Sequence, residues 1–410
     1  MNLPKSKALL AGALVSAVSV ATAAGAVTAS ARSAHPASTP TISLSQLTNN
    51  FSAMKALKPL ASQGSGPIAA ILPDTTTSAR WADFDAPMLT KAMQAAGLSS
   101  SDIIVQNAHG SDSTFLADAK ADITKGAKVL LTTPADSTTG VAVENYAKAH
   151  GVKVVDYDRL TLGGSRPYYV SFNNVTVGTL IGKGFVSCVK AWHIAHPNVI
   201  VMHGDAADNN ATLFYQGYNS VLAPKFKSGA YKNLTPPYLK GTWDAPTALA
   251  EFKGAYAKFK GTANSMVNPN DNTASGIINY LIQQGVKPHT FPATGQDASA
   301  PGLQAILAGY QCGTVYKPIY KEAQAAVALA MYLRAGKTAP HSLLNGTTAD
   351  VQEHNKAVPS ALLTPTWVTG ANMESTVIKD KFVPTNQICK GTFSGSGVSL
   401  AAACAKLHIK

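Results

Sequence analysis

The stretch LPDTTTSARW, residues 72–81, follows an apolar run of the kind that forms a buried strand. It combines one carboxylate, four hydroxyl side chains, a guanidinium group and an indole. Such residues can bind phosphate, take part in catalysis or bind a hydroxyl-rich ligand. Phosphate loops need glycines that bring backbone N–H groups close to the anion, and this stretch has none. Catalysis and binding therefore remain, and the neighbouring segments of the fold must decide between them.

Comparable polar residues follow the other apolar runs of the chain. The carboxyl ends of parallel strands meet at one edge of a sheet, where α/β proteins bind their ligands. We therefore expect polar side chains from these positions to gather in a cleft. The segments concerned are Asp74 to Trp81, Asn107 to Asp112, Pro134 to Ser137, Asp156 to Arg159, Gly204 to Asn210, Asn268 to Asp271 and Gly295 to Asp297.

Paired carboxylates at such positions could hydrolyse glycosides. The candidates are Asp158, Asp208, Asp271 and Asp297. Each has an adjacent guanidinium or amide group, which tends to keep a carboxylate ionised and accepting hydrogen bonds. The same mixture suits a neutral polyol, with Trp81 and Trp243 available to cover an apolar sugar face. Binding is therefore favoured, and a secreted glycoside hydrolase is the alternative.

Other chemistries have weaker signals. His193 and His196 are three residues apart, which is typical of a surface pair, and NPNDNTASG lacks the acidic spacing of a calcium loop. The segment GSGVS resembles a nucleophile motif, but no strand precedes it. We expect neither a metal nor a cofactor, and no enzymatic activity.

Apolar runs alternate with segments of helical periodicity from Gly66 onwards. PIAAILP, DIIVQNA, KVLLTTP and VKVVDYD are expected strands, with a helix after each of the first three. A second series begins with a helix in VTVGTLIGKGFVSCVKAWH and a strand in NVIVMHGD. The alternation predicts an α/β protein with parallel sheets flanked by helices, arranged as two Rossmann-like lobes.

The composition fits a well-packed globular chain. Of 410 residues, 46% are hydrophobic and 14% are charged, and the formal net charge is +12. Lys and Arg are scattered without a basic block, so we expect no nucleic-acid partner.

The N-terminus has the layout of a secretory signal. Lys5 and Lys7 precede a long run of small apolar residues, and Ala29 and Ala31 occupy A-x-A positions. We expect export with cleavage after Ala31; a retained membrane anchor is the alternative, because the run is near spanning length. No cysteine occurs before Cys188, so a lipoprotein is not expected.

The four cysteines of an exported chain suggest disulfides. Cys389 and Cys404 bracket a Gly/Ser-rich segment, so this local pair is expected first. That leaves Cys188 with Cys312, although either could be a buried free thiol.

Seven collinear motifs carry a resemblance to a known family: LPDTTTSARW, YDRL, YYVSFNNVTVG, GDAADNNA, TWDAP, ATGQDA and LAGYQCGTVYKP. Over residues 66–385 the chain resembles the periplasmic-type sugar-binding proteins of bacterial ABC transporters, and most of all the D-xylose-binding branch. The resemblance implies the type I periplasmic-binding-protein fold, two lobes joined by three crossovers. It implies a monosaccharide ligand such as D-xylose or a similar aldose, an ABC permease as partner, and a monomer. A sugar sensor for a signalling receptor is an alternative.

The residue patterns and the resemblance together give a domain plan. We expect a signal peptide at 1–31, a linker with a short helix at 32–65, a first lobe at 66–170 plus 316–364, a second lobe at 171–315 plus 365–388, and a Cys-bearing tail at 389–410. The family's gene regulators carry a DNA-binding helix pair where this chain has its signal segment, which argues against a repressor.

The family's sugar contacts fall on residues that this chain retains. Proline in NPND, next to Asn270, departs from the family pattern. The implied ligand-binding residues are Arg80, Trp81, Arg159, Asp208, Asn210, Trp243, Asn270, Asp271, Asp297 and Lys317.

Overall fold

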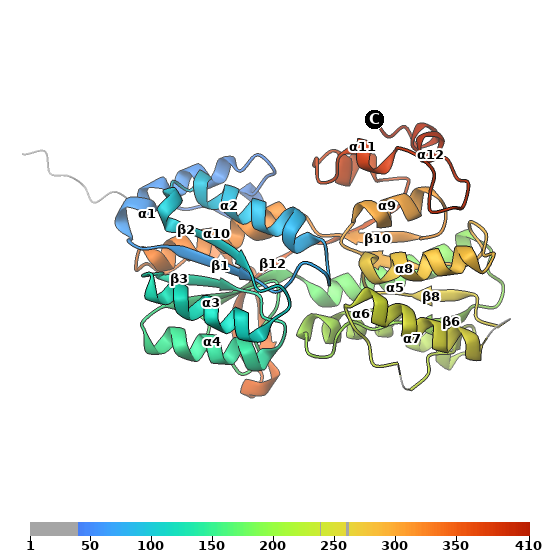
Figure 1. The fold of residues 1–410 in the computed structure, drawn as a ribbon, viewed down its shortest axis with the longest axis horizontal. Helices are drawn as coiled ribbons and strands as arrows, with labels where there is room; N and C mark the ends of the chain where they lie inside the picture. The colour runs from blue at the N-terminus through green and yellow to red at the C-terminus, as the bar shows by residue number, and fades with distance from the viewer. Residues whose placement is uncertain (1–39, 238, 260–261) are drawn as a thin grey trace, which may run out of the picture. The chain divides into compact units, whose positions relative to one another are not determined.

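The computed structural model describes residues 40–237, 239–259 and 262–410. The expected signal peptide and the first residues of the expected linker lie outside these ranges. Within them the chain forms two lobes, each with a sheet flanked by helices (Figure 1). Among the described helices, none has the length and apolar character needed to cross a membrane.

The first lobe contains a seven-stranded sheet in the order β11-β12-β5-β4-β3-β1-β2. All neighbours are parallel except β11 and β12. The strands are β1 (Ile68–Leu72), β2 (Ile103–Asn107), β3 (Val129–Thr132), β4 (Lys153–Tyr157), β5 (Tyr168–Phe172), β11 (Gly346–Asp350) and β12 (Lys356–Leu363). The central strands β1 and β3 are buried along their whole length, as a parallel sheet covered on both faces requires.

Two layers of helices cover this sheet. The layer of α2 and α10 packs on one face, and α3 and α4 pack on the other. The helices are α1 (Lys58–Gln63), α2 (Ala86–Ala95), α3 (Asp112–Thr124), α4 (Ser137–Ala149) and α10 (Ile319–Arg334). A π-helical turn, η3 (Trp81–Asp85), leads from the β1 loop into α2.

The second lobe has two three-stranded sheets, β7-β6-β8 and β13-β10-β9. The Met266 amide donates to the Pro292 carbonyl at 2.8 Å, so β8 and the start of β9 lie side by side. The strands are β6 (Asn198–Val201), β7 (Lys232–Asn233), β8 (Ser265–Val267), β9 (Thr294–Gln296), β10 (Gly313–Tyr316) and β13 (Thr366–Val368). The helices are α5 (Asn174–Ala191), α6 (Asn209–Lys227), α7 (Ala245–Lys258), α8 (Asp271–Gln283), α9 (Ala300–Leu307), α11 (Thr385–Ile388) and α12 (Leu400–Lys406).

The chain passes between the lobes three times. The crossings lie between β5 and α5, between β10 and α10, and between β12 and β13. The two-lobed α/β architecture with three crossovers is therefore present as expected, and the crossings lie close to the expected lobe boundaries.

Residues 40–65 differ from the linker that the sequence suggested. They form the short helices η1 (Leu44–Gln46) and η2 (Ser52–Leu57), followed by α1. Leu47, Phe51 and Met54 are buried in the core of the first lobe beside α2 and α10. Ser, Thr and Asn made the segment look like a linker, but its apolar residues recur often enough to pack against the lobe.

The C-terminal residues also belong to a lobe rather than to a separate tail. Phe393, Leu400 and Cys404 are buried in the core of the second lobe. Two disulfides, Cys389–Cys404 and Cys188–Cys312, are present, which confirms both expected pairings. Residues 341–360, which lay outside the motif pattern, contribute the β11–β12 hairpin.

Candidate ligand-binding site

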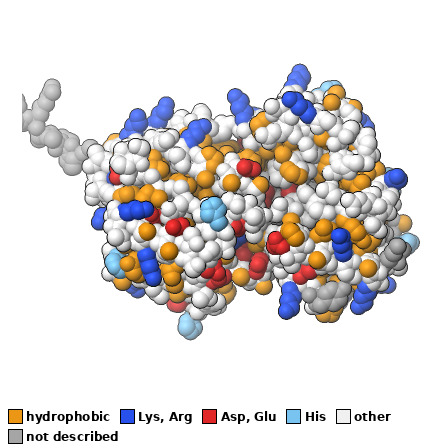
Figure 2. Space-filling view, in the orientation of Figure 1, with side chains coloured by type: hydrophobic (Ala, Val, Ile, Leu, Met, Phe, Trp, Pro, Cys, Tyr) orange, Lys and Arg blue, Asp and Glu red, His pale blue; other side chains and the backbone are white. Residues whose placement is uncertain are grey.

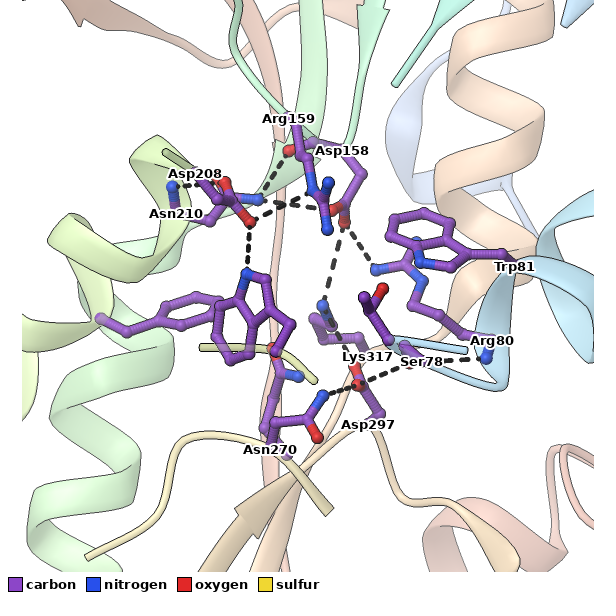
Figure 3. A pocket seen from close by; sticks show the side chains of 14 residues that line it. Ser78, Arg80, Trp81, Asp158, Arg159, Asp208, Asn210, Asn270, Asp297 and Lys317 are labelled. Carbon is purple, nitrogen blue, oxygen red and sulfur yellow. Dashed lines mark hydrogen bonds and ion pairs between the residues drawn. The ribbon is translucent and has the colours of Figure 1, made fainter. Parts of the chain in front are cut away.

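A cavity lies between the two lobes, at the carboxyl ends of their strands (Figure 3). Nine of the ten expected ligand-binding residues line it, and the exception is Asp271. The lining residues are Thr77, Ser78, Arg80, Trp81, Asp158, Arg159, Asp208, Asn210, Phe214, Trp243, Asn270, Gln296, Asp297 and Lys317.

Asp158 is the central carboxylate on the first-lobe side. It follows β4 with a positive φ of 63°, which is uncommon for non-glycine residues, although Asp adopts it more readily than most. Its Oδ2 accepts from Arg80 Nη1 at 2.6 Å and lies 3.8 Å from Lys317 Nζ. Burial opposes ionisation, but the positive charges of Arg80, Lys317 and Arg159 outweigh it and lower the pKa of Asp158 to about 2.

Arg80 faces the cavity from η3, but carboxylates occupy most of its donors. Nε and Nη2 donate to Asp85 at 2.9 and 2.7 Å, and Nη2 also donates to Glu322 at 2.7 Å. Burial and the charge of Arg80 act in opposite directions on Asp85 and Glu322, and burial prevails, so the pKa of both is raised. Arg80 therefore holds Asp158 in place, and the expectation that it also donates to a sugar stays a prediction.

Trp81 is buried beside two guanidinium groups. The guanidinium carbon of Arg80 lies 4.5 Å from the ring centroid, and that of Arg159 lies 5.4 Å away. Both distances are typical of cation–π contacts. Among the described residues, the buried indole Nε1 has no hydrogen-bond partner. Trp81 therefore presents both an aromatic surface and an unused donor at the cavity.

Helix caps position the second-lobe side. Asp208 caps α6, with Oδ1 accepting from the Asn210 amide at 2.9 Å. Its Oδ2 accepts from Trp243 Nε1 at 3.1 Å and lies 3.2 Å from Arg159 Nε. Burial raises the pKa of Asp208, with Arg159 acting in the opposite direction. Trp243 lies directly on Gly204, where a Cβ atom would come within 2.2 Å of the ring.

Asn210 bridges the lobes through both ends of its amide. Its Nδ2 donates to the Asp158 carbonyl at 2.9 Å, and its Oδ1 accepts from Asn174 at 2.7 Å and from the Tyr169 hydroxyl at 3.1 Å. Tyr169 and Asp158 belong to the first lobe, and Asn210 belongs to the second. The amide is therefore fixed in orientation at the edge of the cavity (Figure 3).

Asp297 and Lys317 close the remaining side. Their Oδ1 and Nζ atoms lie 3.2 Å apart, and Asp297 Oδ2 accepts from Ser78 and from Asn270, each at 3.2 Å. Asn270 also caps α8 through the Thr273 amide at 3.0 Å. Asp297 has a positive φ of 98°, so a second cavity carboxylate occupies a backbone region that is unfavourable for side-chain-bearing residues.

The charges of the lining are matched in pairs. Arg80 faces Asp158, Arg159 faces Asp208 and Lys317 faces Asp297, each within 3.2 Å. Like the indole of Trp81, the buried Gln296 Oε1 has no hydrogen-bond partner within the part of the chain that the structure describes. The cavity thus offers a charge-balanced surface with unused donors and acceptors.

On the face in Figure 2, Lys and Arg side chains are scattered rather than gathered into a patch.

Asp271 lies away from the cavity, which corrects its assignment as a ligand-binding residue. Its carboxylate accepts from the Ser299 amide at 2.9 Å, from Gln311 at 2.8 Å and from Thr314 at 3.0 Å. Burial raises its pKa to about 7. The carboxylate therefore ties α8 to the elements around it, and its neighbour Asn270 faces the cavity instead.

The list of implied ligand-binding residues left out five lining residues: Thr77, Ser78, Asp158, Phe214 and Gln296. Four of them stand within the strand-end segments that were expected to gather in a cleft. Phe214 lies one turn into α6, and its helical spacing gave no such signal. Among the described residues, no group of His, Cys, Asp and Glu could hold a metal ion.

Comparison with known proteins gives concordant matches. Residues 68–338 match the family model described as periplasmic binding protein domain. A D-xylose-binding periplasmic protein of Escherichia coli (strain K12) is 36% identical over 282 residues, 68% of this chain and 81% of the relative. A multiple sugar-binding periplasmic protein of Azospirillum brasilense is 33% identical over 326 residues, 76% of this chain and 88% of the relative.

Solved structures give a similar result. A carbohydrate transporter solute-binding protein from Chloroflexus aurantiacus, in complex with D-glucose, has a TM-score of 0.69 and 26% identity. The match covers 78% of this chain and 97% of that chain.

Proposed function

This chain belongs to the periplasmic binding protein family, and we propose that it captures a neutral monosaccharide, D-xylose or a similar aldose, and delivers it to an ABC permease. The supporting observation is the cavity between the lobes, which carboxylates, amides, a guanidinium group and aromatic rings line from both sides. Carboxylates accept from sugar hydroxyls, amides both donate and accept, and the rings cover apolar C–H surfaces. The relatives named above carry sugar-binding descriptions, which support the same assignment.

The paired charges of the cavity favour a neutral ligand. A uronic acid or a sugar phosphate would bring an anion beside Asp158, Asp208 and Asp297, with no cation free of a carboxylate partner among Arg80, Arg159 and Lys317. A buried charge without a partner is costly. An uncharged aldose can instead share these groups without disturbing their balance.

A binding role fits these carboxylates better than hydrolysis. A general acid must hold a proton near neutral pH, whereas the pKa of Asp158 is lowered to about 2. Asp208 accepts from the Asn210 amide and from Trp243, and Asp297 pairs with Lys317. For Asp208 these partners act against burial, which raises its pKa. We therefore propose a protein without enzymatic activity.

Titration calorimetry against a panel of aldoses tests the proposal directly. We expect saturable binding of D-xylose or another neutral monosaccharide, and no binding of the corresponding uronic acid. Incubation with aryl glycosides should release no reducing sugar. Hydrolysis of a glycoside, or the absence of binding to every aldose in the panel, would refute the proposed function.

The proposal includes export and a monomeric state. The Lys-apolar-A-x-A layout of residues 1–31 supports export. N-terminal sequencing of the mature protein from its host should begin at Arg32, and light scattering should give the mass of one chain. An intact N-terminus on a cell-associated protein would identify an anchor instead.

A further inference from the structure

We propose that Asn272 determines sugar affinity from outside the cavity, by fastening the second lobe to the first when the cleft is closed. Asn272 lies in the first turn of α8, and its Nδ2 donates to the backbone carbonyls of Thr76 and Thr77 at 3.2 and 3.1 Å. These acceptors lie in the first lobe, in the loop after β1. Asn272 itself does not line the cavity. The inference rests on the proposed function, because it concerns how that site closes.

The acceptor loop is held by hydrogen bonds within its own lobe. Asp74 Oδ1 accepts from the amides of Thr76 and Thr77 at 2.8 and 2.7 Å, and Oδ2 accepts from the Thr77 hydroxyl at 2.6 Å. Asn107 donates to the Asp74 carbonyl at 2.7 Å, which fixes the loop to the end of β2. All these contacts lie within the first lobe. The two carbonyls that Asn272 meets are therefore preorganised, which lowers the entropic cost of the contact.

The donor, Asn272, lies in the first turn of α8, and the residue that caps this helix lines the cavity. Asn270 caps α8 and donates to Asp297 inside the site, and Asn272 stands two residues further along at the rim. Asn272 is half-buried, and the contact with Thr77 is partly shielded from water. Closure of the lobes on a ligand and formation of the rim contact therefore involve the same rigid element.

A residue that stabilises only the closed arrangement affects all ligands alike. A ligand that touches both lobes binds the closed form better, so its apparent affinity includes the free energy of closure. Removing the rim contact should thus weaken every sugar by the same factor. A residue that touches the sugar would instead change the ranking of sugars.

Asn272→Ala tests this inference, with Asn279→Ala as the matched control. Asn279 is exposed on the same helix, two turns from the rim. Alanine favours helix more than asparagine does, so both variants should fold. For Asn272→Ala we expect the Kd of each of two bound aldoses to rise about threefold to tenfold, with their ratio unchanged and sugar release faster. Asn279→Ala should match the wild type.

Sugar-free small-angle scattering separates this inference from the proposed function. A larger radius of gyration for Asn272→Ala than for the wild type would support the rim contact without any ligand. If the wild type binds no aldose, the proposed function fails. The sugar-free radii of the wild type and Asn272→Ala then test the rim contact by themselves. The inference is overturned if Asn272→Ala equals the wild type in both Kd and sugar-free radius, or if it changes the ranking of aldoses.

Discussion

Single side chains in this cavity cap helices and line the candidate site at the same time. Asp208 caps α6 with one oxygen and meets Trp243 and Arg159 with the other. Asn270 caps α8 and donates to Asp297. A helix cap has a fixed orientation, so these groups reach the cavity with little side-chain freedom left to lose on binding.

Asp297 and Arg159 give a prediction at this scale. We expect Asp297→Ala and Arg159→Ala each to weaken aldose binding at least tenfold, because a charged hydrogen-bond partner typically contributes about 1.5–3 kcal/mol. Calorimetry measures the affinity, and thermal unfolding verifies the fold. Asp83→Ala, at an exposed position of η3, is the control. Unchanged affinity in both folded cavity variants would place the binding site elsewhere.

At the scale of elements, Asp271 links α8 to the segments around β9 and β10. Its carboxyl oxygens accept hydrogen bonds from Gln311 and Thr314, at the start of β10, and from Ser299, at the start of α9. Burial raises the pKa of Asp271 to about 7, whereas the pKa of this side chain in the unfolded chain is about 4. The folded state therefore favours the protonated carboxyl.

This shift predicts a pH dependence of stability. The contribution of protonated Asp271 is fully present below about pH 4 and is lost as the pH rises through about 7. Urea unfolding between about pH 4 and about pH 8 should show the free energy of unfolding of the wild type falling relative to Asp271→Asn. The change should amount to a few kcal/mol at most. A difference between the two proteins that does not vary with pH would contradict the assignment.

The short helices before β1 give a second prediction for an element. Met54 is fully buried against the first lobe. Met54→Ala should lower the free energy of unfolding by about 2–5 kcal/mol, the usual cost of such a cavity. Lys55→Ala, exposed in the same turn, should change it little. Equal denaturation midpoints for Met54→Ala and the wild type would show that residues 40–65 do not stabilise the first lobe and act as a linker.

At the scale of the whole molecule, the two lobes meet through contacts inside and outside the cavity. Ser78 reaches Asp297 across the site, and Phe84 of the first lobe stacks on Phe382 of the second at 4.1 Å. The residues that line the cavity come from both lobes, so a ligand held in it touches both.

We therefore expect sugar to shift the lobes toward the closed arrangement. Small-angle scattering should give a smaller radius of gyration after a bound aldose is added. A sugar that calorimetry finds not to bind serves as the control and should leave the radius unchanged. The same radius with and without a tightly bound aldose would show that closure does not accompany binding.

The alternation of strands and helices, the two lobes and most of the cavity lining could be predicted from the sequence. Period-2 and period-3.6 patterns are local, and residues after parallel strands must meet at one edge. Nine lining residues, including Arg159, Asp208 and Lys317, could therefore be named in advance with the help of motif resemblance. The disulfide Cys389–Cys404 followed from proximity along the chain.

The directions in which neighbouring side chains point could not be predicted, because they depend on tertiary packing. Asn270 and Asp271 are adjacent, yet one meets the cavity and the other is buried among Ser299, Gln311 and Thr314. Arg80 faces the cavity, and its partners Asp85 and Glu322 are distant from each other along the chain. Phe214 and the rim contact of Asn272 depend on how one lobe lies against the other. Such partners are brought together by packing across hundreds of residues, and no local pattern encodes them.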